Sequence, residues 1–460
     1  MNTHIDFAKI FFKVLKKKCY LNTFNFNSII MKYFERKLLE ELKNWTKRRE
    51  ILAIKGPRQS GKTTLLEMLR EELEKEVGEE NIVFLTFEDL EVREKFEADA
   101  KEFISSFIFD KARYYFLLDE FHYVKDGGQK LKLLYDTLKN TKFVITGSSS
   151  LELRGETAAY LTGRMFSFEL LPFSFYEFLN ARDKRFARIY SKRNSLVENL
   201  INGQDFSIKE GSDIFVDDLL KLLDEFIRFG GYPEVIKSKR DEEKLIVLKN
   251  IINTYIDKDI IKFLNITDAL KFKRILTLLS SICGNILRYE GICTYSNTYY
   301  KEVVHILDIL QQTYVIDLLR PYHRNLVTEL RKNPKVYFVD HGLRNYLINN
   351  FSELEVRVDK GALAENFILN RLKALVGDKG IIHFWRTTAK AEVDFVIEMP
   401  DRLIPIEVKF EPFKKEKVPK GLFSFIRAYS PAVAIVVTKN FLAEKVVEKT
   451  RVEFIPIVYF

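Results

Sequence analysis

Cysteine is scarce in this chain, which has three in 460 residues, at Cys19, Cys283 and Cys293. Three widely spaced thiols cannot build the disulfide framework of a small secreted domain, and no His/Cys spacing predicts a zinc site. No apolar run approaches the ~18 residues of a membrane span, so we expect no transmembrane helix. Few and scattered cysteines suit a reducing compartment, and we expect the protein to be cytoplasmic.

Net positive charge is also small outside the N-terminus. Residues 1–50 hold twelve Lys/Arg and five Asp/Glu, a charge of +7, so the other 410 residues carry only +2 of the net +9. The folded body is therefore not predicted to be a general polyanion binder. Residues 1–30 lack the order of a signal peptide, and we expect a poorly ordered extension, with a membrane-surface segment as the alternative. Met31 and Met1 both remain candidate start residues.

A glycine-rich loop with a lysine and a threonine is the most specific motif in the chain. The apolar run Ile51–Ile54 predicts a strand before it, and apolar residues at helical spacing follow it. In such a loop the backbone amides and the helix N-terminus bind phosphates, the lysine reaches the β/γ-phosphates, and the threonine hydroxyl binds Mg²⁺. The predicted nucleotide-binding residues are Gly56, Pro57, Arg58, Gln59, Ser60, Gly61, Lys62, Thr63 and Thr64.

Two adjacent carboxylates follow a second apolar run, at residues 115–118. Such a run predicts a buried strand whose end places both acids beside the nucleotide. We expect Asp119 to hold Mg²⁺ and Glu120 to polarise the attacking water, with Lys62 also in the catalytic set. The gap between the loop and the acids leaves room for a helix and one further strand, at residues 82–86.

Two further residues are candidates for contacting the nucleotide. The strand expected at residues 143–146 is followed by Ser148, which either contacts the γ-phosphate or belongs to a serine-rich turn. Arg164 is either a phosphate-sensing arginine, acting in cis or across a subunit boundary, or an ordinary surface residue.

Together these strings resemble an AAA-type ATPase family of bacteria and archaea. The resemblance rests on Gly-Pro-Arg-Gln-Ser-Gly-Lys-Thr-Thr-Leu-Leu, Leu-Leu-Asp-Glu, Thr-Gly-Ser-Ser and Leu-Thr-Gly-Arg, and extends to Leu-Pro-Phe-Ser-Phe-Tyr-Glu-Phe and Gly-Gly-Tyr-Pro. It implies a parallel sheet with an extra strand between the phosphate-loop strand and the Asp-Glu strand. It further implies ATP as the nucleotide, a winged-helix-like region, and a C-terminal domain related to restriction endonucleases.

The middle of the chain has one basic segment and one region rich in tyrosine. Residues 181–193 carry six basic residues and one acid, which indicates a solvated helix face or a phosphate-contacting strip. From about residue 270 to 346 the pattern predicts three helices and a two-stranded hairpin, the order of a winged helix. Its recognition helix would begin near Tyr295, Asn297, Tyr299, Tyr300 and Lys301, which are suited to DNA or to protein contact.

A second group of acids lies near the C-terminus. Asp394 and the pair Glu407-x-Lys409 fall on two runs that predict a hairpin, and Glu365 falls on an expected helix. Residues two apart on a strand share a face, so Glu407 and Lys409 should converge beside Asp394. This pattern is similar to that of restriction endonucleases, which implies that Asp394 and Glu407 bind metal, that Lys409 is catalytic, and that Glu365 is a supporting acid. The alternative is a polar strand pair or a decayed nuclease fold.

The sequence therefore predicts a multidomain α/β protein. We expect an extension (1–30), an AAA-type P-loop ATPase domain (31–180), a linker and helical region (181–239), a winged-helix-like domain (240–346) and a nuclease-like domain (355–460). Its expected function is ATP and Mg²⁺ binding and ATP hydrolysis, in association with DNA, with a metal-dependent nuclease-like C-terminal domain. The alternative is an ATP-dependent switch that binds DNA or protein and cuts nothing. A homo-oligomer is a further expectation from the resemblance.

Overall fold

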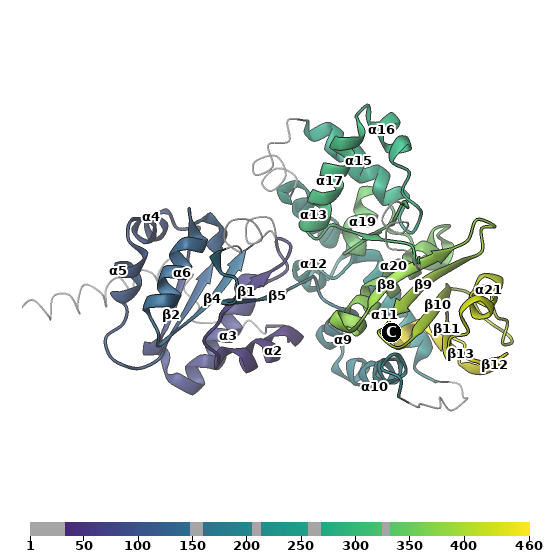
Figure 1. Cartoon of the computed structure of the whole chain (residues 1–460), viewed down its shortest axis with the longest axis horizontal. Coiled ribbons are helices and arrows are strands. Elements are labelled where there is room, and N and C mark those ends of the chain that lie inside the picture. The colour runs from purple at the N-terminus through teal and green to yellow at the C-terminus, as the bar shows by residue number, and fades with distance from the viewer. Residues whose placement is uncertain (1–32, 148–159, 205–212, 256–267, 324–331) are drawn as a thin grey trace, which may run out of the picture. The chain divides into compact units, whose positions relative to one another are not determined.

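The computed structural model describes residues 33–147, 160–204, 213–255, 268–323 and 332–460. The expectations for residues 1–30 and for Ser148 lie outside these ranges. The described residues form two compact units: 33–55, 62–147 and 160–168 make the first, and 56–61 with everything from 169 onward make the second. Figure 1 labels the helices and strands of both units.

The first unit is built on a five-stranded sheet with the order β2-β3-β4-β1-β5. Its strands are β1 (Ile51–Lys55), β2 (Ile82–Thr86), β3 (Tyr114–Asp119), β4 (Thr141–Gly147) and β5 (Met165–Glu169). The pairs β2–β3, β3–β4 and β4–β1 are parallel. The strand that carries the phosphate loop is thus separated from the Asp-Glu strand by β4, as the resemblance implied.

Helices connect the parallel strands, as parallel pairing requires. They are α3 (Lys62–Val77), α4 (Leu90–Ala98), α5 (Ala100–Ser105) and α6 (Gly127–Thr137), whereas α2 (Lys37–Thr46) precedes β1. Strands β1, β3 and β4 are buried along their whole length, which explains why they appear in the sequence as continuous apolar runs. Phe121, one residue beyond the Asp-Glu pair, lies in the core of this unit, edge-on to Phe87 with ring centroids 5.3 Å apart.

The second unit begins with helices and continues through a small two-stranded sheet. The helices are α9 (Phe175–Arg182), α10 (Lys184–Ile201), α11 (Val216–Phe229), α12 (Pro233–Lys237), α13 (Asp241–Thr254), α15 (Ala269–Ser281), α16 (Tyr289–Ser296), α17 (Tyr300–Gln312) and α19 (His341–Leu347). Strands β6 (Ile316–Leu319) and β7 (Lys335–Phe338) pair antiparallel. The three helices and two strands expected between residues 270 and 346 occur in the expected order.

The Gly-Gly-Tyr-Pro string has a packing role in this unit. Gly230 ends α11 with a φ of 79°, and a Cβ on Gly231 would lie 2.3 Å from the carbonyl oxygen of Phe173. The backbone of Gly231 is held on both sides: its carbonyl accepts from the Phe173 amide at 2.7 Å, and its amide donates to Asp340 at 2.7 Å. The two glycines therefore let α11 end against the segment that contains Phe173.

A mixed six-stranded sheet forms the C-terminal part, with the order β12-β13-β11-β10-β9-β8. Its strands are β8 (Ile381–Arg386), β9 (Glu392–Glu398), β10 (Leu403–Lys409), β11 (Val433–Thr438), β12 (Ala443–Val447) and β13 (Thr450–Pro456), with α20 (Lys360–Val376) and α21 (Lys420–Tyr429). Strands β9 and β10 form the antiparallel hairpin expected from the sequence. Short 3₁₀ helices lie at Glu79–Asn81, Phe121–Tyr123, Leu354–Val356, Gly377–Lys379 and Ile457–Tyr459. Within the described residues, none of the helices combines the length and apolar character needed to cross a bilayer.

Candidate functional sites

The phosphate loop connects β1 to α3 through unusual backbone conformations. Gly61 has a φ of 94°, and Gln59 has a φ of 60°, in the left-handed region that is costly for a residue with a side chain. Gly56 leaves no space for a Cβ, which would lie 2.1 Å from the carbonyl oxygen of Leu170. Helix α3 begins at Lys62, so the lysine and Thr63 occupy its first turn. The backbone amides there point toward the N-terminal end of the helix, where a phosphate can bind.

Asp119 is held by two threonines at the end of β3. The Thr63 hydroxyl donates to Oδ2 at 2.9 Å, and the Thr146 hydroxyl donates to Oδ1 at 2.6 Å. Thr146 lies on β4, the strand between β1 and β3, so the added strand supplies a group that links the acid to the sheet. Thr63 and Asp119 are adjacent, as a shared Mg²⁺ ligand set requires, and they fit the metal expected there.

The environment of Asp119 opposes a free negative charge. Burial, together with the adjacent Glu120, raises the pKa of Asp119 to about 6, although both threonine hydroxyls and Lys62 act in the opposite direction. The side chain is 4% exposed. A buried carboxylate with a raised pKa is a group that gains from a nearby cation, which is the chemistry expected of a Mg²⁺ ligand.

Glu120 is fixed by contacts on both its main chain and its side chain. It has a φ of 50°, and its amide donates to the Thr146 hydroxyl at 2.9 Å. Its Oε2 lies 3.0 Å from Nδ1 of His122, whose side chain is completely buried. A left-handed glutamate costs conformational energy, and the contacts from Thr146 and His122 hold it there. Sequence reasoning missed both residues, although Thr146 belongs to the Thr-Gly-Ser-Ser string.

Arg164 lies at the other end of β1. Its carbonyl accepts from the amide of Ile51, the first residue of β1, and its guanidinium pairs with Asp136 at 3.1 Å. The phosphate loop begins after the last residue of the same strand, roughly 16 Å away for a five-residue strand. This placement does not support the sensing role in cis, and a role across a subunit boundary stays a proposal.

The C-terminal acids gather around the β9–β10 hairpin as expected. Lys409 lies 2.7 Å from Glu407 and 4.0 Å from Asp394, and Asp394 accepts the Val408 amide at 2.9 Å. Asp394 and Glu407 are 7% and 6% exposed. Oε2 of Glu407 has no hydrogen-bond partner among the described residues.

A lysine that the sequence did not predict lies in the same cluster. Lys335, on β7, lies 2.6 Å from Glu392, 3.8 Å from Glu365 and 3.9 Å from Asp394. Burial raises the pKa of both Glu365 and Glu407, and the neighbouring Asp394 raises it further. Tyr337, two residues after Lys335, donates a hydrogen bond to Glu365 at 3.2 Å.

The donor set of this cluster suits Mg²⁺, because it consists of carboxylates and includes a Glu407 oxygen without a hydrogen-bond partner among the described residues. Its arrangement does not. In the described part of the chain, no group of three or more His, Cys, Asp or Glu side chains is placed to hold a metal ion. The ammonium group of Lys335 lies among the carboxylates that would have to converge. The residue types therefore suit a metal ion, but their arrangement in this structure does not.

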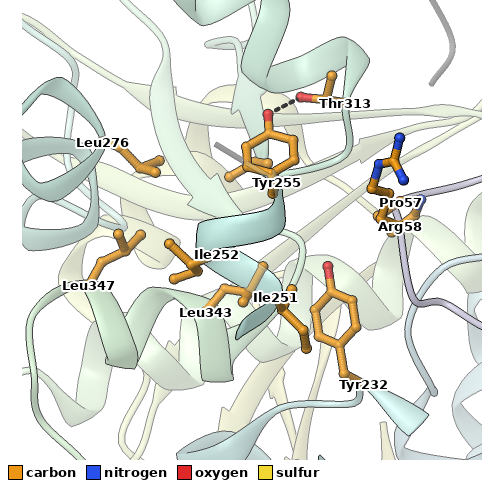
Figure 2. A pocket seen from close by; sticks show the side chains of 11 residues that line it. Pro57, Arg58, Tyr232, Ile251, Ile252, Tyr255, Leu276, Thr313, Leu343 and Leu347 are labelled. Carbon is orange, nitrogen blue, oxygen red and sulfur yellow. Dashed lines mark hydrogen bonds between the residues drawn. The ribbon is translucent and has the colours of Figure 1, made fainter. Parts of the chain in front are cut away.

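Two other regions bear on function. At the turn between α16 and α17, Tyr295, Tyr299 and Tyr300 are 60%, 66% and 58% exposed. The second unit also has a small apolar pocket (Figure 2). Its lining comprises Pro57, Arg58, Tyr232, Ile251, Ile252, Tyr255, Leu276, Thr313, Val315, Leu343 and Leu347. The Tyr255 and Thr313 hydroxyls are hydrogen-bonded to each other across one side of it.

Comparisons with known families divide the chain into three parts. Residues 48–179 match an AAA domain, residues 220–354 a domain of unknown function (DUF8612), and residues 360–460 another domain of unknown function (DUF4143). The chain thus carries an AAA-type P-loop domain, as its sequence predicted. The matches to the other two regions assign neither a winged helix nor a nuclease.

Relatives align over most of the chain. An uncharacterized protein of Haemophilus influenzae is 27% identical over 89% of this chain and 92% of its own length. An uncharacterized protein of Methanocaldococcus jannaschii is 25% identical over 84% of this chain and 79% of its own. Among solved structures, the Walker-type ATPase PABY2304 of Pyrococcus abyssi has a TM-score of 0.44 at 13% identity, covering 69% of this chain and 96% of its own. The Aeropyrum pernix ORC2 protein, in ADPNP and ADP complexes, has a TM-score of 0.37 at 13% identity, covering 76% and 97%. At these scores the structural likenesses carry no functional argument.

Proposed function

We propose that the protein is an ATPase that binds Mg²⁺-ATP at the phosphate loop and hydrolyses it. The observation that carries this proposal is the set of contacts around Asp119: Thr63 and Thr146 hold its two oxygens, and the Thr146 hydroxyl also fixes the Glu120 backbone. The residues that would hold Mg²⁺ are therefore preorganised beside the residue that would orient water. Bound Mg²⁺ would neutralise charge on the phosphates, and Glu120 would accept a proton from the attacking water.

The test compares three single-residue variants in nucleotide binding and in phosphate release. Lys62→Ala should weaken ATP binding and abolish turnover, because the lysine contacts the β/γ-phosphates. Glu120→Gln should keep ATP binding and lose turnover by about 100-fold or more, because general-base catalysis contributes about 10²–10⁴-fold. Lys75→Ala is the matched control, since this lysine is on the same helix and exposed. Full turnover in Glu120→Gln would refute the proposed role of Glu120.

We further propose that the ATPase acts together with DNA. Support comes from the order of elements from α15 to β7, which suits a winged helix. Exposed tyrosines add to it, with Tyr295 near the end of α16 and Tyr299 and Tyr300 beside Lys301 at the start of α17. Replacing Tyr299 and Tyr300 by alanine should weaken DNA binding measured by fluorescence anisotropy at several salt concentrations. An unchanged affinity would indicate that this surface contacts protein and not DNA.

For Arg164 we propose a phosphate-sensing role across a subunit boundary, which requires a homo-oligomer. Measuring the size of the protein in solution, with and without ATP, tests for that oligomer.

For the C-terminal domain we propose a nuclease-like fold with Asp394, Glu407 and Glu365 as acids and Lys409 as the catalytic lysine. The measurement is cleavage of supercoiled and linear DNA with Mg²⁺ or Mn²⁺, with and without ATP. Loss of cleavage in Lys409→Ala would support a nuclease, and loss in Lys62→Ala would show that ATP controls it. The second candidate is an ATP-dependent switch that cuts nothing, and the position of Lys335 among the acids favours it.

A further inference from the structure

Lys335 is a buried cation that comes from outside the sheet carrying the acids. Strand β7 pairs with β6, with Lys335 opposite Leu319, and belongs to the region before α19. Lys335 and Tyr337 are two residues apart and therefore share a face of β7. Both contact Glu365 on α20, at 3.8 Å and 3.2 Å. One face of β7 is thus directed at the nuclease-like cluster.

The neighbouring carboxylates account for the burial of the Lys335 ammonium group. Its side chain is 3% exposed and lies 5.4 Å from the ring centroid of Phe384. Three carboxylates within 4.0 Å surround the ammonium group. One of them, Glu392, also pairs with a cation outside the cluster, Arg386 at 3.1 Å. An ammonium in such a site is stabilised mainly by close anions, because its desolvation is costly.

The same acids are those that a divalent ion would need. Mg²⁺ and Mn²⁺ bind carboxylate oxygens directly, at about 2.0–2.2 Å, and demand that these oxygens converge. An ammonium at 3.8 and 3.9 Å from Glu365 and Asp394 is close to both acids and repels a second cation. Glu407 differs from Glu365 and Asp394, because one of its buried oxygens lacks a hydrogen-bond partner within the described ranges.

We propose that Lys335 is the buried cation of the C-terminal carboxylate cluster, and that a divalent metal ion binds there only when the Lys335 ammonium leaves. The inference rests on the proposed nuclease-like site and says what controls its metal occupancy. It explains why the acids are assembled without a metal-holding arrangement among the described residues. It also assigns the β6–β7 segment to control of this site, because the segment supplies the competing cation.

The test measures Mn²⁺ binding by electron paramagnetic resonance, which reports free Mn²⁺, on the full chain without nucleotide. All proteins carry Thr63→Ala so that the phosphate-loop site does not contribute. Lys335→Met removes the ammonium and keeps most of the apolar stem, and it should bind Mn²⁺ at least about tenfold more tightly than the parent, within the usual range for coupled sites. Adding Glu407→Gln to Lys335→Met should abolish the gain.

Lys373→Met is the matched control. Lys373 is on α20 and pairs with Asp317 of β6 at 2.6 Å, so its replacement removes one charge and one ion pair between the same segments outside the cluster. It should leave Mn²⁺ affinity unchanged. Equal affinity in the parent and in Lys335→Met would overturn the competition while leaving the metal site standing. Binding in neither protein would overturn both the competition and the metal-dependent nuclease proposal, whereas the ATPase proposal would be untouched.

A second measurement needs no substitution in the cluster and covers the case in which Lys335→Met does not fold. Acetic anhydride modifies exposed lysines, and mass spectrometry reports the extent at each position. Lys335 should be protected without metal, because it is buried. Saturating Mn²⁺ should increase its modification several-fold and leave that of Lys373 unchanged. Continued protection of Lys335 in protein that has bound Mn²⁺ at the cluster would overturn the proposal.

Discussion

The hydroxyl of Thr146 donates to Asp119 at 2.6 Å and accepts the amide of Glu120 at 2.9 Å. A single side chain on β4 therefore sets the position of both carboxylates at the end of β3. The hydroxyl is used as donor and as acceptor at once, which only serine, threonine or a similar group can do. This double contact makes Thr146 a positioning residue whose loss should affect the metal ligand and the general base together.

Thr146→Ala should lower kcat by about 10- to 100-fold, since hydrogen bonds to charged groups contribute roughly 1.5–3 kcal/mol. The Mg²⁺ concentration needed for half-maximal activity should rise, because Asp119 loses its link to β4. Thr146→Ser keeps the hydroxyl and should restore most of the activity. Steady-state ATPase assays over a range of Mg²⁺ concentrations measure both effects. An Mg²⁺ dependence that stays the same in Thr146→Ala would contradict the positioning role.

His122 should influence catalysis through Glu120, which it contacts at 3.0 Å. We expect His122→Ala to reduce kcat by about tenfold with little change in KM, because removing a buried partner leaves Glu120 free to adopt other rotamers. In a Glu120→Gln background the same substitution should add much less, since the two residues act as a unit. Additive losses in this double-mutant cycle would show that His122 supports the fold and not the glutamate.

Gly231 offers a stability prediction with a control in the same unit. A Cβ at this position would lie 2.3 Å from the Phe173 carbonyl oxygen, a backbone atom that cannot move alone. Gly231→Ala should therefore lower the free energy of unfolding by about 1–3 kcal/mol. A Cβ added to Gly291, inside α16, would meet no atom of the described residues within 4 Å, so Gly291→Ala should raise stability by roughly 0.5–1 kcal/mol. Urea denaturation of both variants distinguishes the two effects.

Much of the first unit could be predicted because its signals are local. The strand expected at residues 82–86 has those bounds in the structure. The phosphate loop follows one buried strand that appears as an apolar run, and Asp119 ends another. The β9–β10 hairpin was predictable for the same reason, since alternation and spacing bring Asp394 and Glu407 together. Thr146 was not predicted, because sequence alone does not show which polar residue near the end of a strand faces the acids.

Lys335 illustrates what the sequence did not reveal. Its partners Glu365 and Glu392 are 30 and 57 residues away, on a helix and on another sheet, and no spacing rule connects them. A lysine at the start of a short strand is usually read as solvated, because isolated ammonium groups are rarely buried. Only the packing of β7 against α20 and β9 gives it three acidic neighbours. The charge balance of the C-terminal site is therefore a property of tertiary structure.

The segment before α20 yields a pH-dependent prediction. Burial alone would raise the pKa of Asp359, but Arg357 and Arg344 hold it well below its usual value, with contacts of 2.8 Å and 2.5 Å. A carboxyl whose pKa is lower in the folded state adds stability above the unfolded pKa of about 3.9, and this stability is lost as the pH falls through that value toward the folded pKa. Stability of the second unit should therefore fall between about pH 5 and pH 2.

Asp359→Asn should remove this contribution. Both arginines are almost completely buried, at 3% and 1% exposed, and would lose their shared anion, so we expect a loss of roughly 3–5 kcal/mol in the free energy of unfolding at pH 7. At pH 3 the two proteins should differ less, because the wild-type carboxyl there approaches the neutral state in the unfolded chain. Urea denaturation at pH 7, 5 and 3 measures the difference. Asp378→Asn is the control, because Asp378 is exposed and follows α20, the helix that Asp359 precedes. A difference between wild type and Asp359→Asn that stays constant across the three pH values would contradict the linkage and assign the loss to packing alone.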